Sequence, residues 1–173
     1  RPRCNATKVT GQSMIDRTPP PSQVTIDGIM RVMEVAFDPA FGEAWNRRQI
    51  SDALLLPSTH AIVTDENGEA LTDPQSEPAG FVLSRHAADE EELLLIAVSP
   101  SFRGHGLGKS LMDQLFDAAG SRGVAHVFLE MRRGNPAVNL YQKVGFEPVG
   151  ERIDYYMKSD GTRIDAITFR KSL

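Results

Sequence analysis

The chain has 173 residues, of which 40% are hydrophobic and 24% charged, as is usual for a globular protein with one core. The net charge of −4 argues against a nucleic acid as the main ligand, and no apolar run reaches the roughly 20 residues of a membrane span. The only cysteine is Cys4, and the start lacks the pattern of a secretory signal. We therefore expect a cytoplasmic protein with neither nucleic acid nor membrane as a partner, and composition leaves its oligomeric state open.

The N-terminal part of the chain divides into a predicted tail and two predicted helices. Residues 1–22 end in a proline-rich stretch and are predicted to form a flexible tail, whereas residues 23–173 form a single predicted domain. Asp27 is a candidate cap for a first helix, which the Asp-Pro pair at residues 38–39 interrupts. A second helix is expected over residues 45–54.

Three strands are predicted next, from short runs of apolar and β-branched residues. They are expected at residues 59–64, 79–86 and 93–98. A hairpin turn is predicted at residues 65–68, and the polar, proline-containing residues 71–78 are interpreted as a mobile surface extension. Residues 89–92 are all acidic, and we interpret them as a solvated turn rather than a site.

The most informative stretch, residues 95–110, joins the third strand to a helix through a loop with glycines at three alternate positions. These are Gly104, Gly106 and Gly108. Glycine lets the backbone approach a bulky ligand and adopt a positive φ, and a helix N-terminus presents free N–H groups at the positive end of its dipole. Together these features predict an anion site, most often for phosphate.

Three phosphate-binding patterns compete for this loop, beside the interpretation that it is a turn without a ligand. The P-loop pattern requires its first glycine where Arg103 stands, and the dinucleotide pattern G-x-G-x-x-G has a different spacing. The pattern R/Q-x-x-G-x-G/A is satisfied by Arg103, Gly106 and Gly108. This motif resembles the acyl-CoA pyrophosphate loop of the GNAT superfamily of N-acetyltransferases.

The rest of the chain continues to alternate helices and strands. A helix that starts near Leu107 is expected to end at Gly123, and a short one runs from Asn135-Pro136 to Gly145. Strands are expected at residues 124–131, 146–154 and 163–169. The order ααβββαβαββ predicts an α/β (α+β mixed) fold, with a central mixed β-sheet that helices flank on both faces.

Several sequence blocks, in this order, resemble the GNAT superfamily and, within it, the RimI-type enzymes that acetylate protein N-terminal α-amines. The blocks are IAVSP, RGHGLG, LEMRRGNPAVNLYQKVGF, ERIDYY and GTRIDAI. The resemblance runs from residue 79 to the C-terminus, and more loosely from residue 25. It implies the GNAT fold, an acyl-CoA loop between the central strand and helix, and acetyl-CoA as co-substrate.

The resemblance also implies an acetyl-CoA-dependent N-acetyltransferase that acts on the N-terminal α-amine of a protein or peptide, such as a ribosomal protein. An α-amine has a reference pKa of about 7.7–8.0 against about 10.4 for lysine, so a modest base is enough. The resemblance places Glu130 as this general base, acting through a water molecule or with the help of burial. It places Tyr141 as the general acid for the CoA thiolate. Without the resemblance, these residues are a strand-end carboxylate and a core tyrosine.

The contacts expected with acetyl-CoA follow from the geometry of the strand and the glycine loop. The backbone of Ile96, Ala97 and Val98 would pair with the pantetheine arm, and the Val98 N–H is a candidate oxyanion donor. Asn135 would hydrogen-bond to the pantetheine, or would only cap a helix. The residues expected around the pyrophosphate are Arg103, Gly104, His105, Gly106, Leu107, Gly108 and Lys109.

Four aromatic residues are expected to form a slot for the acceptor, with packing in the core as the alternative. They are Phe37, Trp45, Tyr155 and Tyr156. RimI-type proteins usually carry an F-x-x-x-W-like lip, and here Phe37 and Trp45 lie further apart. None of the four histidines has a metal-ligand spacing, so no metal is predicted.

Two other functions stay open at this point. One is a GNAT acetyltransferase of a small amine, such as an aminoglycoside or a polyamine, for which the widened lip leaves room. The other is a non-catalytic acyl-CoA-binding module, which would need neither Glu130 nor Tyr141. The tyrosine pair and the RIDAI segment favour the protein acceptor.

Overall fold

The computed structural model describes residues 22–173, so the predicted tail, including Cys4, lies outside the described residues except for Ser22. The helices are α1 (Gln23–Ala36), α2 (Arg47–Leu54), α3 (Leu107–Ser121) and α4 (Val138–Lys143), with short 3₁₀ turns η1 (Pro39–Phe41) and η2 (Pro100–Phe102). The strands are β1 (Thr59–Thr64), β2 (Gly80–Ala87), β3 (Glu90–Val98), β4 (His126–Arg132), β5 (Glu147–Met157) and β6 (Arg163–Ser172). The predicted order of helices and strands is confirmed. No helix in this part of the chain has the length and apolar character to cross a membrane.

The first two helices start at side-chain caps that the sequence analysis did not identify. Ser22 caps α1 by accepting the N–H of Thr25 at 3.1 Å, so the predicted cap Asp27 is wrong and lies inside the helix. Asn46 and Gln49 form a reciprocal capping box at the start of α2. Both starts satisfy N–H groups that a helix terminus leaves without a partner.

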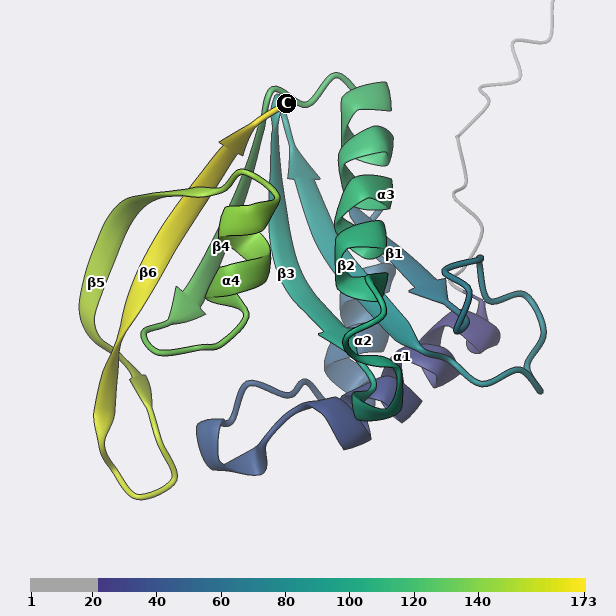
Figure 1. Ribbon diagram of the computed structural model, residues 1–173, viewed down its shortest axis with the longest axis horizontal. Coiled ribbons are helices and arrows are strands. Elements are labelled where there is room, and N and C mark those ends of the chain that lie inside the picture. Colours follow the sequence, from purple (N-terminus) through teal and green to yellow (C-terminus); the bar gives the residue numbers. More distant parts are fainter. Residues whose placement is uncertain (1–21) are drawn as a thin grey trace, which may run out of the picture.

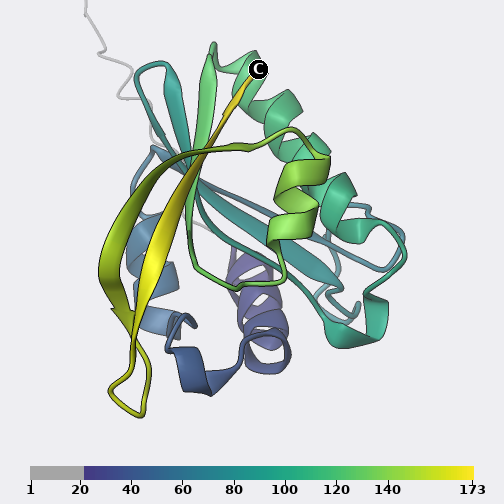
Figure 2. The same ribbon diagram turned by 60° about the vertical axis from the view of Figure 1, so that its left-hand side comes forward.

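The six strands form one mixed sheet in the order β1-β2-β3-β4-β6-β5, with helices on both faces (Figures 1 and 2). β3 and β4 run parallel but pair only between residues 90–93 and 126–129. Beyond these residues the two strands diverge into a V, with α4 near its opening (Figure 1). At the point of divergence, Leu94 is an extra residue of β3 opposite Leu83 and Ser84, and such a bulge bends a strand.

Two hydrophobic clusters, one on each face of the sheet, hold the helices in place. On the α3 face, Leu111 and Leu115 pack with Val127 and Leu129 of β4. On the α1 face, α1 packs on β2 and β3 through a cluster that includes the fully buried Ile29. Because side chains alternate along a strand, the residues of β4 between its core positions face the α1 side. These residues are Phe128, Glu130 and Arg132.

Three segments differ from the prediction. The acidic residues 90–92 belong to β3 rather than to a solvated turn, and Glu91 is fully buried. Leu71, at the start of the predicted mobile extension, packs against Gly28 of α1, and Arg31 donates a hydrogen bond to the Ser76 carbonyl at 3.1 Å. β5 continues to Met157, so the two tyrosines lie in a strand and not in the loop after it.

Candidate active site

The inner edge of β3 directs backbone groups that do not pair with β2 into the V. Ser99 N–H donates to the carbonyl of Ala79 at 2.8 Å, which fixes the pattern of hydrogen bonds between β2 and β3. These bonds alternate along an antiparallel pair. The backbone groups of Ala97 therefore hydrogen-bond to β2, whereas those of Ile96 and Val98 point toward the gap between β3 and β4. Of the three predicted backbone contacts, two therefore face the opening between β3 and β4.

The loop before α3 presents a bare backbone surface. Gly104 and Gly106 have φ values of 83° and 86°, and a Cβ at either position would meet no atom within 4 Å. Gly106 is the N-cap of α3 and makes no side-chain cap, so the first N–H groups of this 15-residue helix are open to a ligand. His105 is exposed between the glycines. This arrangement fits a pyrophosphate, which needs donors and room.

The two predicted cations of this loop lie differently. Lys109 is exposed on the first turn of α3, where it pairs with Asp113 at 2.5 Å. Arg103 is also exposed, but it bonds to the backbone: its Nε donates to the Val98 carbonyl at 3.0 Å and its Nη2 to the Ala36 carbonyl at 3.2 Å. Arg103 therefore joins the end of β3 to the C-terminus of α1, and its contact with a pyrophosphate stays a prediction.

Gly108 and Asn135 hold α4 close to the V. A Cβ at Gly108 would lie 3.2 Å from Leu140, so glycine lets α4 approach the start of α3. The Asn135 Oδ1 accepts the N–H of Ala137 at 2.9 Å and so forms a turn before α4, but the N-cap of α4 is Ala137, so the predicted cap role of Asn135 is wrong. The Asn135 amide NH₂ is then the group that could reach a pantetheine arm.

Tyr141 lies on α4 and is buried against Phe146, with ring centroids 6.0 Å apart. Burial, followed by the nearby Glu43 and Tyr156, raises the pKa of Tyr141 well above its usual value. The phenol therefore stays protonated and keeps a hydrogen that it can donate. Its neighbours Glu43 and Tyr156 come from two other parts of the chain.

Glu130 is the carboxylate at the mouth of the V, one residue beyond the last β3–β4 pair. It accepts the Thr168 hydroxyl at 3.4 Å and lies 3.3 Å from Nε of Arg152, and its side chain is 21% exposed. Burial first, then Glu130 and Glu43, raises the pKa of Tyr156 to about 12. Two carboxylates, Glu43 and Glu130, and two tyrosines, Tyr141 and Tyr156, thus surround the opening of the V.

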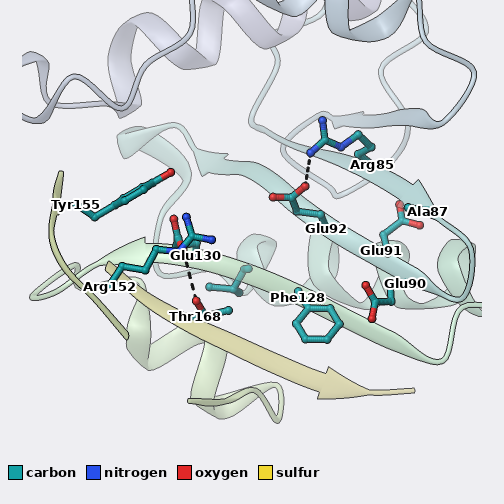
Figure 3. Close-up of a pocket in the computed structure, with 11 residues that line it drawn as sticks. Arg85, Ala87, Glu90, Glu91, Glu92, Phe128, Glu130, Arg152, Tyr155 and Thr168 are labelled. Atoms are coloured by element: carbon teal, nitrogen blue, oxygen red, sulfur yellow. Dashed lines mark hydrogen bonds and ion pairs between the residues drawn. The ribbon is translucent and has the colours of Figure 1, made fainter. Parts of the chain in front are cut away.

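A pocket of about 330 Å³ extends from Glu130 along this face (Figure 3). Phe128 lies in it, and the ion pair of Arg85 with Glu92 lies across from Arg152 and Tyr155 (Figure 3). Tyr155 is half exposed and contacts Tyr156 edge-to-face at 5.2 Å. The pocket gives an acceptor a path to Glu130 from the side opposite the glycine loop.

The loop between α1 and α2 contacts the β5–β6 hairpin beside this pocket. Arg132 lies 3.5 Å over the Phe41 ring and 3.3 Å from Glu43, and Ser159 N–H donates to the Ala40 carbonyl at 3.3 Å. The aromatic residue that faces the hairpin is therefore Phe41. Phe37 and Trp45, predicted to line the slot, instead pack partly buried against the α1-face cluster, as core residues would.

The sequence analysis missed several residues of this site. They are Phe41, Glu43, Arg132, Arg152 and Thr168. Strand alternation places Arg132 on the same face as Glu130, but the sequence carries no signal that brings Glu43 there. Among residues 22–173, no group of three or more His, Cys, Asp or Glu side chains could hold a metal ion.

The chain is similar to several known acetyltransferases. Residues 26–146 match the acetyltransferase (GNAT) family. The ribosomal protein bS18-alanine N-acetyltransferase of Haemophilus influenzae is 33% identical over 119 residues, which cover 66% of this chain and 82% of that protein. The structure of the ribosomal-protein-S18-alanine N-acetyltransferase from Escherichia coli is 27% identical, has a TM-score of 0.72, and covers 87% of this chain and 89% of that one. Nourseothricin acetyltransferase is also 27% identical, with a TM-score of 0.57 and coverage of 67% and 66%.

Proposed function

The chain belongs to the acetyltransferase (GNAT) family, and we propose that this acetyl-CoA-dependent N-acetyltransferase modifies the α-amine of a protein N-terminus, with a ribosomal protein as acceptor. The proposal depends above all on the arrangement at the mouth of the V, where Tyr156 lies close enough to both Glu130 and Tyr141 to interact with each. The similarity to bS18-alanine N-acetyltransferases supports the class of acceptor. The pocket beside Glu130 gives an extended N-terminus room to reach it (Figure 3).

Acetyl-CoA supplies an activated acyl group as a thioester, and this chain's residues position it and the amine. The N-terminus of α3 would hold the pyrophosphate, and the Ile96 and Val98 backbone would pair with the pantetheine arm. In this position the Val98 N–H can donate to the oxygen that gains negative charge during attack. Glu130 would take the proton of the amine, directly or through water.

Tyr141 would act as the general acid at the leaving sulfur. A thiol has a pKa of about 8.5, so its thiolate needs little help to leave. Burial raises the pKa of Tyr141 well above this value, so complete proton transfer to the sulfur runs uphill. We therefore expect Tyr141 to contribute mainly through a hydrogen bond to the sulfur.

The Tyr141→Phe variant is expected to lower kcat about tenfold, the effect of losing one hydrogen bond of about 1.4 kcal/mol. Phenylalanine keeps the packing on Phe146, so acetyl-CoA affinity should stay at the wild-type level. Because its pKa is raised, the phenol remains a donor at higher pH than a free tyrosine. Steady-state kinetics between pH 7 and 10 check both points, and an unchanged kcat would rule out the role.

The Gly106→Ala variant is expected to raise KM for acetyl-CoA about tenfold, because an alanine at a positive φ costs roughly 1–2 kcal/mol and distorts the loop. KM for the acceptor should stay the same. Gly120→Ala, in the last turn of α3 where a Cβ meets no atom within 4 Å, is the matched control. Equal KM values for Gly106→Ala and wild type would remove this loop from the acetyl-CoA site.

A mass-spectrometric assay tests the proposed function. The protein is mixed with acetyl-CoA and peptides that carry both a free N-terminus and an internal lysine, together with polyamines and aminoglycosides. Acetylation of the α-amine is the expected result. Acetylation of the small amines alone would contradict the proposal and favour a small-amine acetyltransferase. The similarity to nourseothricin acetyltransferase would then support that alternative.

A further inference from the structure

β5 contains a bulge directly before the tyrosine pair. Arg152 pairs with Ala166 on β6, and the next pairing joins Tyr156 to Ile164. β5 therefore advances four residues where β6 advances two, so β5 carries two extra residues. Asp154, inside the bulge, has a φ of 58°, a left-handed conformation that is uncommon outside glycine and in which aspartate is enriched.

The bulge decides where Tyr156 lies. With regular pairing through this region, Asp154 rather than Tyr156 would lie opposite Ile164. Tyr156 would then be displaced by two residues, roughly 7 Å along the strand, to a point beyond the start of β6. It would lose its half-buried position close to Glu130.

The carboxylate of Asp165, on β6, holds this irregular backbone. Its Oδ1 accepts the N–H of Asp154 at 3.1 Å, which gives that donor a partner inside the bulge. Its Oδ2 lies 3.3 Å from Nε of Arg133, and its backbone carbonyl accepts the Arg133 N–H at 2.8 Å. Arg163 adds a hydrogen bond from Nη1 to the Asp154 carbonyl at 3.2 Å. The Asp154 bond, with a smaller effect from Arg133, lowers the pKa of Asp165 and favours its charged form.

Asp165 faces away from the acceptor. Its neighbour Ala166 pairs with Arg132 and shares the α1 face with Glu130, so alternation directs Asp165 to the α3 face. We propose that Asp165 is a positioning residue, which holds the β5 bulge and so presents Tyr155 and Tyr156 to the incoming N-terminus. This inference rests on the proposed function and adds a specificity element to the same site.

The test is steady-state kinetics on a synthetic peptide with a free N-terminal alanine, using Asp165→Ala and Asp165→Asn. Asp165→Ala is expected to raise the peptide KM about tenfold and to leave the acetyl-CoA KM within about twofold of wild type. The asparagine oxygen can still accept from Asp154, so Asp165→Asn should bring the peptide KM back to within about threefold of wild type. A general loss of structure would instead affect both substrates.

A second variant perturbs the bulge without changing Asp165. Valine is β-branched and strained at a positive φ, so Asp154→Val is expected to give the same selective rise in peptide KM. Asp65→Ala is the matched control, because Asp65 also accepts backbone N–H groups, of Asn67 and Glu69, but lies after β1 at the opposite edge of the sheet. It should leave both KM values unchanged.

The outcomes separate the inference from the function on which it rests. The inference alone is overturned if the wild type acetylates the peptide and the peptide KM of Asp165→Ala and Asp154→Val equals the wild-type value. The same holds if both KM values rise together, or if Asp165→Asn is as impaired as Asp165→Ala. A wild type that acetylates no peptide α-amine overturns the proposed function, and the inference with it.

Discussion

Replacing Glu130 with glutamine is expected to lower kcat at least about tenfold while acetyl-CoA binds with unchanged affinity. Glutamine keeps the length of the side chain and can still accept the Thr168 hydroxyl, but it takes up no proton. The ion pair with Arg152 is lost at little cost to the fold, because the Arg152 side chain is 60% exposed. Turnover measurements and a separate acetyl-CoA titration check the two parts of this prediction.

The pH dependence of the Glu130→Gln variant separates a base from a structural residue. An α-amine with a pKa of about 7.7–8.0 is mostly charged at pH 7 and mostly neutral at pH 9. The deficit should therefore be largest near pH 7 and shrink as pH rises. Glu147→Gln, at the exposed start of β5, is the control and should behave as wild type. Undiminished turnover at neutral pH would exclude the base role, and loss of acetyl-CoA binding would make Glu130 structural.

The order of elements could be predicted because glycine, proline and apolar runs act locally. The strand Thr59–Thr64 has the bounds that its apolar and β-branched residues indicate. Gly123 and Gly145 follow α3 and α4 with φ values of 82° and 93°, as expected at a helix end. Helix starts were less predictable, since Ser22 and Asp27 are both good caps and only packing selects between them.

The two sides of the site differ in how far the sequence reveals them. The glycine loop before α3 is contiguous, so its pattern alone indicated a phosphate site. The acceptor side is assembled from loops and strands far apart in the chain, and nothing local shows that Glu43 lies by Arg132 or that Phe41 rather than Phe37 faces the hairpin. The bulge at Asp154 depends on pairing with β6, which the sequence of β5 does not contain.

Replacing Glu91 with alanine is expected to lower the free energy of unfolding by about 3 kcal/mol. The side chain of Glu91 is fully buried, accepts the Ser84 hydroxyl at 2.5 Å and pairs with Arg122 at 2.8 Å. Removing one partner of a buried ion pair costs roughly 3–5 kcal/mol because the other is left uncompensated. Arg122 is 25% exposed, so water reaches it and the lower end applies. In the sequence, Glu91 cannot be distinguished from its three acidic neighbours. In the structure, alternation along β3 buries only Glu91 of the three glutamates in this strand.

Thermal unfolding measures the effect of Glu91→Ala, with Glu90→Ala as the matched control. In a domain of this size each kcal/mol shifts Tm by roughly 2–4 °C, so Glu91→Ala should lose about 6–12 °C. Glu90 is exposed, and its variant should change stability by less than about 0.5 kcal/mol. The pair of Glu91 with Arg122 joins β3 to the end of α3 where β3 and β4 still pair, away from the mouth of the V. Turnover well below Tm should therefore stay at the wild-type level, and equal Tm values for the two variants would contradict the buried pair.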